Sequence, residues 1–219
     1  MLVNDCMTRH PILISPETPA YAAQKIMAEN NIRHLPVTGG GKRLKGLITR
    51  QSFALAPDVL ASLDVWDITR YLSGLNVKNI MLPAKKVYSI HPQKTVERAA
   101  RLMNEHKIGC LPVIEDGDVV MGIITESDLL DALQEMLGMP EAGVRVTIRM
   151  PDRPGEFAKL SDALGKHRMG VIGIGTYPSR RREGFWDVVL KIRGVSCPDV
   201  DTILRDIPDQ EIIDLRDVV

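Results

Sequence analysis

The chain has 219 residues, enough for one large domain or two to three small ones, and long enough to bury a core without disulfides or metals. Its 28 basic and 28 acidic residues balance to zero net charge, which argues against a general nucleic-acid binder and a polybasic membrane-surface protein. Hydrophobic residues make up 44% and charged residues 26% of the chain, as is usual for folded globular proteins.

The three cysteines, Cys6, Cys110 and Cys197, are too few and too far apart for a disulfide framework, so a reducing compartment is expected. Residues 1–8 lack the cationic start and apolar run of a signal peptide. No stretch reaches the ~18 apolar residues of a membrane span. We therefore expect a cytoplasmic protein with no membrane contact.

An internal repeat organises the first 137 residues. Residues 31–37 and 107–113 share the pattern Ile-x-x-Leu-Pro-Val, and residues 46–49 match residues 122–125. Both matches have the same offset of 76 residues (36 to 112, and 49 to 125). Met7 aligns with Met81 at an offset of 74, so the second copy has two extra residues in its first loop. The chain therefore contains two copies of one supersecondary unit.

Each copy predicts the order β-α-β-β-α. A short strand, at 12–14 or 87–90, precedes a helix capped by Thr18 or Thr95. The apolar stripes of the two helices contain Ala22, Ala23, Ile26 and Met27 in the first copy, and Val96, Ala99, Ala100 and Met103 in the second.

A predicted hairpin follows the helix in each copy. Its strands are expected at 35–38 and 44–48 in the first copy, and at 111–114 and 119–124 in the second. Gly39-Gly40-Gly41-Lys42 lies in the first hairpin and lacks the spacing of a phosphate-binding loop, so it is interpreted as a turn. A last helix begins at Arg50 or Glu126. We expect the copies to stack sheet to sheet, with a ligand cleft between them.

These motifs resemble the cystathionine-β-synthase (CBS) domain, and two in tandem resemble a Bateman module. The resemblance rests on Met7-Thr8, Leu35-Pro36-Val37, Gly46-Leu47-Ile48-Thr49 and their second-copy partners. It implies CBS unit 1 at 1–55, a helical linker at 56–76 anchored by Trp66, and CBS unit 2 at 77–137. It also implies adenosine ligands (AMP, ADP, ATP, S-adenosylmethionine or sometimes NAD) and a flat dimer of two modules.

In the CBS family a Gly-h-h-Thr-x-x-Asp segment, in which h is a hydrophobic residue and x any residue, binds the ligand's ribose. The second copy keeps it, with Thr125, Ser127 and Asp128. The Asp128 carboxylate could accept hydrogen bonds from both ribose hydroxyls, at about 1.5–3 kcal/mol for a bond to a charged group. In the first copy the segment contains Thr49 and Arg50, and Ser52 replaces the aspartate. We therefore expect the better ribose site in the second copy and an empty, weaker or adapted site in the first.

Four further side chains are expected near the phosphate end of the first copy: Arg9, His10, His34 and Arg50. Two alternatives stay open. Thr-x-x-Asp at a helix start is also close to a capping box, which is purely structural. Each of the four basic side chains could equally be solvated.

A different unit follows a linker at 134–143 that contains Gly138, Pro140 and Gly143. The predicted order is βαββαβ, a ferredoxin-like arrangement, so the chain belongs to the mixed α/β (α+β) class. The strands are expected at 144–150, 171–177, 186–192 and 211–215, and the helices at 156–167 and 199–205. Phe157, Leu160 and Leu164 are expected on the buried face of the first helix.

The turn Asp152-Arg153-Pro154-Gly155-Glu156-Phe157 resembles the ACT domain, here residues 143–219. This regulatory module commonly binds amino acids, so Asp152 and Gly155 are candidate ligand residues. The segment 168–171 lacks the Gly-x-Asn that the family often shows, which favours a ligand-free dimerisation or docking module. Arg180-Arg181-Arg182 is interpreted as a solvated turn.

No catalytic or metal-binding pattern is found. None of the five histidines pairs with another at i+3 or i+4, and no cysteine stands at ligand spacing. We expect a non-catalytic, homodimeric sensor that binds an adenosine nucleotide between its CBS units. The domain order resembles bacterial regulators of acetoin or acetate metabolism. The alternatives are an assembly module that docks a partner enzyme, or an amino-acid sensor acting through the ACT domain.

Overall fold

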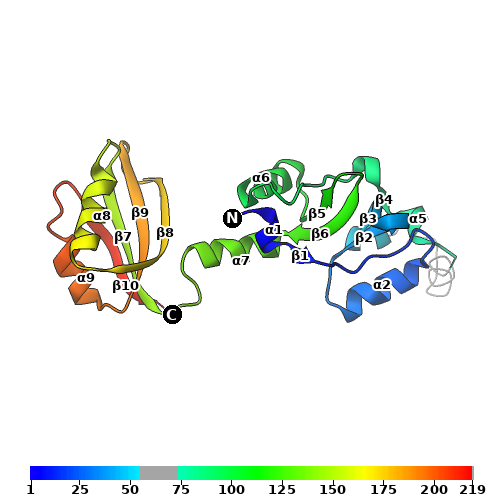
Figure 1. The fold of residues 1–219 in the computed structure, drawn as a ribbon, viewed down its shortest axis with the longest axis horizontal. Coiled ribbons are helices and arrows are strands. Elements are labelled where there is room, and N and C mark those ends of the chain that lie inside the picture. Colours follow the sequence, from blue (N-terminus) through cyan, green and yellow to red (C-terminus); the bar gives the residue numbers. More distant parts are fainter. Residues whose placement is uncertain (55–73, 219) are drawn as a thin grey trace. The chain divides into compact units, whose positions relative to one another are not determined.

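The computed structural model describes residues 1–54 and 74–218. It contains two compact units, Met1–Leu129 and Leu130–Val219. Figure 1 shows the elements of both units. Of the predicted helical linker, residues 56–73 with Trp66 lie outside the described residues.

The first unit contains the two predicted copies. The first copy consists of α2 (Ala20–Glu29), β2 (His34–Gly39), η1 (Gly40–Lys42), β3 (Arg43–Thr49) and η2 (Arg50–Phe53). The second consists of η3 (Ala84–Lys86), α6 (Val96–His106), β5 (Cys110–Glu115), β6 (Val119–Thr125) and the start of α7 (Glu126–Met136), a helix that continues into the second unit from Leu130. The helices and hairpins therefore confirm the repeat, and the glycine run forms the η1 turn.

Three local predictions were wrong. The strands expected at 12–14 and 87–90 shrink to single parallel bridges, Ile14 to Val37 and Ile90 to Val113. In the first copy the reason is that Pro11 and Pro16 flank the segment and supply no N–H to a ladder. Thr18 does not cap α2, because Pro19 occupies the cap position, whereas Thr95 caps α6 by accepting from the Arg98 N–H at 3.3 Å. Ala100 is exposed, outside the buried stripe.

Short leader segments cross between the two copies, which the sequence did not predict. Helix α1 (Val3–Cys6) and strand β1 (Thr8–Arg9) precede the first copy; α5 (Val77–Ile80) and β4 (Leu82–Pro83) precede the second. Val3 is fully buried in the core of the second copy, beside Ile90 and Ala99. Val77 is fully buried in the core of the first, beside Ile14 and Ala23. Each core is therefore completed by the other copy's leader.

The short strands of the leader segments also pair with the other copy. β1 pairs with β6, and β4 pairs with β3. A Cβ atom on Gly122 would lie 2.6 Å from the Met7 sulfur, and one on Gly46 would lie 2.5 Å from the Leu82 carbonyl oxygen. The glycine of each Gly-h-h-Thr segment is therefore required by the crossing leader. The strands form one six-stranded hydrogen-bonded sheet, not the separate stacked sheets expected.

The second unit has the predicted βαββαβ order. Its elements are β7 (Gly143–Pro151), α8 (Glu156–Lys166), β8 (Gly170–Pro178), β9 (Phe185–Arg193), α9 (Cys197–Leu204) and β10 (Glu211–Val218). The sheet has the antiparallel order β10-β7-β9-β8, and both helices pack on one face of it (Figure 1). The expected burial of Phe157 was wrong. It is 44% exposed, because the buried face of α8 contains Glu156, Leu160 and Leu164.

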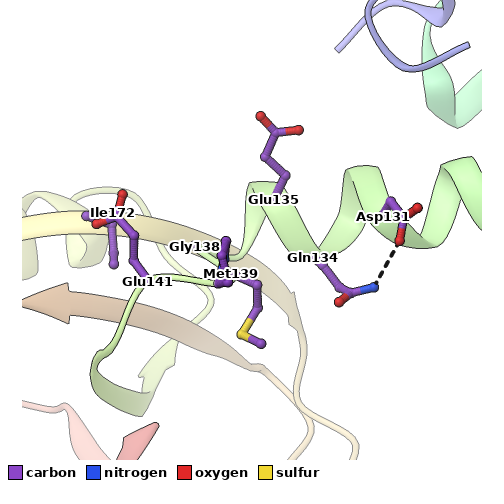
Figure 2. A pocket seen from close by; sticks show the side chains of 8 residues that line it. Asp131, Gln134, Glu135, Gly138, Met139, Glu141 and Ile172 are labelled. Carbon is purple, nitrogen blue, oxygen red and sulfur yellow. Dashed lines mark hydrogen bonds between the residues drawn. The ribbon is translucent and has the colours of Figure 1, made fainter. Parts of the chain in front are cut away.

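The chain between α7 and β7 lies against the opposite face of this sheet. A Cβ atom on Gly173 would come within 2.3 Å of the Leu137 carbonyl carbon, and one on Gly175 would be 3.3 Å from the Leu137 side chain. The buried Lys191 Nζ lies 3.5 Å from the Met139 sulfur. Figure 2 shows the end of α7 and the turn through Gly138 and Met139 beside Ile172. Gly173 and Gly175 of β8 thus make room for the segment that leaves α7.

Candidate functional site

The first unit contains two related pockets. We call them the Thr125 pocket, of about 390 Å³, and the Thr49 pocket, of about 680 Å³. The Thr125 pocket combines Ile123, Thr125 and Ser127 of the second copy with residues 8, 10–12 and 30–34 from the N-terminal side of the chain. The Thr49 pocket combines the segment 49–52 of the first copy with residues 80–83, 86–88 and 107–110 of the second. Each pocket is therefore built by both copies.

Asp128 is held at the start of α7 by Thr125. The backbone N–H and the hydroxyl of Thr125 both donate to Asp128 Oδ2, at 2.7 and 2.8 Å. The Asp128 N–H lies 3.4 Å from the Thr125 hydroxyl oxygen, which accepts from it. Within residues 1–54 and 74–218, Asp128 Oδ1 accepts no hydrogen bond. The carboxylate therefore caps the helix with one oxygen, and its other oxygen is not used by the cap.

The first copy repeats this arrangement without a carboxylate. The Thr49 N–H donates to Ser52 Oγ at 3.1 Å, so the serine also caps its short helix. The hydroxyl has one oxygen, which the cap already uses, whereas a carboxylate has two. The bond from the threonine N–H to the residue three positions on is therefore kept in the first copy, but the spare charged acceptor is lost.

The two pockets differ in charge. Four cationic side chains, Arg33, Arg50, Lys86 and Lys107, line the Thr49 pocket together with a single acidic one, Glu126. Arg33 is the one Lys or Arg that lines the Thr125 pocket in the described part of the chain. The cations therefore gather where the ribose acceptor is missing.

His34 lines both pockets. Burial lowers its pKa to about 4, and the nearby charges of Arg33 and Arg50 act in the same direction. His34 is therefore a neutral imidazole at pH 7, able to donate or accept a hydrogen bond but not to serve as a cation for phosphate.

Cys110 takes the place of His34 in the second copy. It pairs with Thr125 as His34 pairs with Thr49. Burial raises the pKa of the Cys110 thiol to about 12, and the Glu126 charge adds to the effect. The thiol is therefore protonated at neutral pH, as expected of a packed side chain and not of a nucleophile.

The structure gathers most of the predicted site residues. Those that line a pocket are His10, His34, Thr125 and Ser127 at the Thr125 pocket, and His34, Thr49, Arg50 and Ser52 at the Thr49 pocket. Arg9 and Asp128 line neither pocket. The Arg9 guanidinium donates to the Asn4 carbonyl at 2.9 Å, and Asp128 lies next to Ser127, which lines the Thr125 pocket. Sequence reasoning missed Arg33, Lys86 and Lys107. The only available signal for Arg33 and Lys107 was their position just before the repeated Leu-Pro-Val strands.

The candidate ACT residues lie at a turn rich in ion pairs. The Asp152 N–H donates to the Gly184 carbonyl at 2.8 Å, and Gly155 has a φ of +90° at the start of α8. Next to them, the buried Glu156 accepts from Arg153 at 2.7 Å and from Lys159 at 2.9 Å. These bonds lower the pKa of Glu156 to about 2. The charges beside the turn are thus paired within the chain.

No cluster of three or more His, Cys, Asp or Glu side chains could hold a metal ion within 1–54 and 74–218. Within the same ranges no helix combines the length and the apolar character that crossing a membrane requires.

Comparisons with known proteins match both units. The CBS domain model matches residues 3–57 and 77–135, and the TTHA0829-like ACT domain model matches residues 142–216. A CBS domain-containing protein of Dictyostelium discoideum is 32% identical over 138 residues, which are 63% of this chain and 94% of that protein.

Two further relatives are similar over part of the chain. A homoserine O-acetyltransferase of Methanocorpusculum labreanum is 31% identical over 137 residues, 63% of this chain; the match spans only 25% of that enzyme's length. The crystal structure of a proposed acetoin utilization protein (AcuB) from Vibrio cholerae is 31% identical. It covers 60% of this chain and 89% of its own, with a TM-score of 0.50.

Proposed function

The chain belongs to the family of CBS-domain proteins and carries a CBS pair followed by an ACT domain, and from this premise we propose that it is a regulatory sensor for an adenosine nucleotide or derivative. Both domain types are regulatory modules. In this proposal the chain has no catalytic activity of its own. Its cytoplasmic location stays a prediction.

The observation that carries the proposal is the spare oxygen of Asp128. Thr125 fixes the carboxylate through Oδ2, so Oδ1 is pre-positioned without a competing donor from the described residues. A ribose presents two neighbouring hydroxyl donors, which a carboxylate oxygen can accept at about 1.5–3 kcal/mol for a bond to a charged group. The adjoining Thr125 pocket, at about 390 Å³, lies within the usual size range of small-molecule sites.

The charge difference between the pockets favours different ligands. With Arg33 and a neutral His34, the Thr125 pocket suits a nucleoside derivative of low charge, such as AMP or S-adenosylmethionine. The four cations of the Thr49 pocket suit the phosphates of ADP or ATP, but Ser52 offers no charged acceptor for the ribose. We therefore assign the tighter nucleoside binding to the Thr125 pocket.

The path of α7 suggests how binding is transmitted. Asp128 is in the first turn of α7, and the segment that leaves its last turn is packed against Gly173 of the ACT sheet. A ligand can shift this segment only if it binds two arrangements of the protein with different affinities. Control of acetoin or acetate metabolism, and assembly into a homodimer, are proposed only on the resemblance to AcuB and to CBS pairs.

The test is calorimetric titration of the full, nucleotide-stripped chain with AMP, ADP, ATP and S-adenosylmethionine. We expect saturable binding of at least one of them, weakened by Asp128→Ala. Asp131→Ala is the matched control, because this carboxylate is one turn further along α7 and, among the described residues, accepts only from the Gln134 side chain, at 3.4 Å. Flat titrations with all four compounds would refute the sensor.

A second candidate function is an assembly module that docks a partner enzyme. The apolar side chains of Leu130, Leu133 and Met136 favour it, because they lie three residues apart on α7 and are 60%, 48% and 41% exposed. This alternative predicts flat nucleotide titrations, a stable dimer and a co-purifying enzyme. Substitution of Leu130 and Leu133 by Ser would then disrupt assembly without affecting any ligand.

A further inference from the structure

Charged side chains collect on the face of the ACT sheet that α8 and α9 leave uncovered. On β7, Val146 and Ile148 point into the helix-covered core, so the alternate residues Arg145, Thr147 and Arg149 point to the other face. Thr147 and Arg149 are nevertheless only 4% and 8% exposed. This face therefore contains a hollow with a buried polar floor, and not a flat solvated surface.

The hollow has a volume of about 430 Å³. Its floor is a two-pronged ion pair, in which Arg149 donates to the two oxygens of Asp187 at 2.8 and 3.0 Å. This pair lowers the pKa of the Asp187 carboxyl, so the pair is charged at neutral pH. Tyr177 lies directly opposite Asp187 on the neighbouring strand and also lines the hollow.

The rim carries more positive than negative charge. Asp214 accepts from both Arg145, at 2.9 Å, and Arg216, at 3.0 Å, so two guanidinium groups share one carboxylate. Arg180 and Arg181 line the hollow and donate no hydrogen bond to any described residue. Five arginines therefore face two aspartates, which leaves a local charge of +3.

We propose that this hollow binds a small polyanion bearing phosphate or carboxylate groups. Guanidinium groups match both kinds of group with paired, charge-assisted hydrogen bonds. The volume fits a metabolite, and the local charge calls for an anion with two or more negative charges. A second copy of the same face is a poor occupant, because two surfaces of equal positive charge repel each other.

The three consecutive arginines of the hairpin thus have different surroundings. Arg180 and Arg181 line the hollow, whereas the Arg182 guanidinium lies over the Phe185 ring at 3.8 Å from its centre. The interpretation of the whole run as a solvated turn does not account for this difference. Arg182 is therefore a matched control for Arg180 and Arg181, since all three arginines have the same charge and belong to one turn.

The experiment is titration of the full chain with pyrophosphate and, separately, with tricarballylate, a compact tricarboxylate. We expect saturable binding of at least one probe and a loss of at least tenfold in affinity in the double variant Arg180→Ala/Arg181→Ala. Arg182→Ala should change the affinity less than twofold. Binding of one probe alone identifies the group that is recognised, and binding of both shows that charge is sufficient.

Pyrophosphate could also enter the cationic Thr49 pocket, so Arg50→Ala is titrated in parallel. No binding of either probe, equal losses in the Arg182 and Arg180/Arg181 variants, or loss in the Arg50 variant alone would each overturn the proposal. Thermal denaturation of each variant shows whether it is folded. The result does not depend on the nucleotide titrations, because a chain with no adenosine site could still have this one.

Discussion

The replacement Asp128→Asn separates the structural role of this residue from its proposed ligand role. An asparagine side chain keeps one carbonyl oxygen, which can still accept from the N–H and hydroxyl of Thr125, as Asp128 Oδ2 does at 2.7 and 2.8 Å. The other terminal atom becomes an NH₂ donor in place of Oδ1. The helix cap is therefore retained, while the acceptor for the ribose hydroxyls is lost.

The magnitudes of the two effects differ. Losing hydrogen bonds to a charged acceptor costs about 1.5–3 kcal/mol, and each 1.4 kcal/mol is tenfold in affinity, so binding should weaken by roughly 10- to 150-fold. Asp128 is the third residue of α7 and accepts from the Thr125 N–H, a bond that Asn can also accept. Asn therefore loses only the favourable charge near the helix N-terminus, so the unfolding free energy should fall by about 0.3–1 kcal/mol, whereas a fully lost cap costs up to about 2 kcal/mol.

The assay is calorimetric titration with AMP, or whichever compound binds the wild-type chain, combined with urea denaturation of both proteins. Asp128→Ala is the reference that loses both roles and should weaken binding and stability together. If Asp128→Asn bound the ligand as tightly as the wild type while Asp128→Ala was merely less stable, the carboxylate would be a cap only, and the assignment of the ribose site would be wrong.

Three further predictions follow from the same contacts. Ser52→Asp gives the Thr49 pocket the charged acceptor that it lacks and should raise the pocket's affinity for ATP on the order of tenfold. Calorimetric titration should then show a second binding event. An unchanged stoichiometry and affinity would contradict the assignment of this pocket. Gly173→Ala places a Cβ 2.3 Å from the Leu137 carbonyl carbon and should cost about 1–3 kcal/mol of stability. Gly165→Ala in α8, where a Cβ meets nothing within 4 Å, should instead add up to about 1 kcal/mol. Thermal unfolding of both variants measures the two changes, and equal shifts in melting temperature would argue against the packing of Leu137 on Gly173. His34 has a pKa of about 4 in the folded chain against 6.5 in the unfolded chain, so the unfolded chain binds the proton first as pH falls. Stability should therefore decrease as pH drops from about 6.5 towards 4. In His34→Gln the urea midpoint should depend less on pH over this range, and an identical pH dependence in both proteins would refute the prediction.

Local sequence patterns predicted much of this protein correctly. The 76-residue offset identified the two copies, the spacing of Ala99 and Met103 identified the buried face of α6, and the glycine run was assigned to a turn. The order of elements in the ACT domain also followed from periodicity. These features depend on neighbours close in the chain, which is why a single sequence reveals them.

Burial at particular positions was harder to predict. Phe157 was expected on the buried face, yet the residue buried there is its neighbour Glu156, which is only 3% exposed because Arg153 and Lys159 satisfy its carboxylate. A charged residue is buried only when partners are supplied by the fold, and such partners leave no periodic signal. The same holds for Arg149 and Asp187, which are 38 residues apart in the chain.

The sequence by itself determined which supersecondary units this protein contains and in which order, and it identified the motif of Thr125 and Asp128. Repeats, helix caps and hydrophobic periods can be recognised from residues that are close together in the chain. Only the tertiary structure decided how the pockets are completed. Val3 and Val77 each enter the core of the other copy, so that the motif of one copy faces the loop of the other. The physical reason is that strand pairing and core burial depend on contacts between segments far apart in the chain. The hydrophobic pattern of one segment does not specify which distant segment it pairs with.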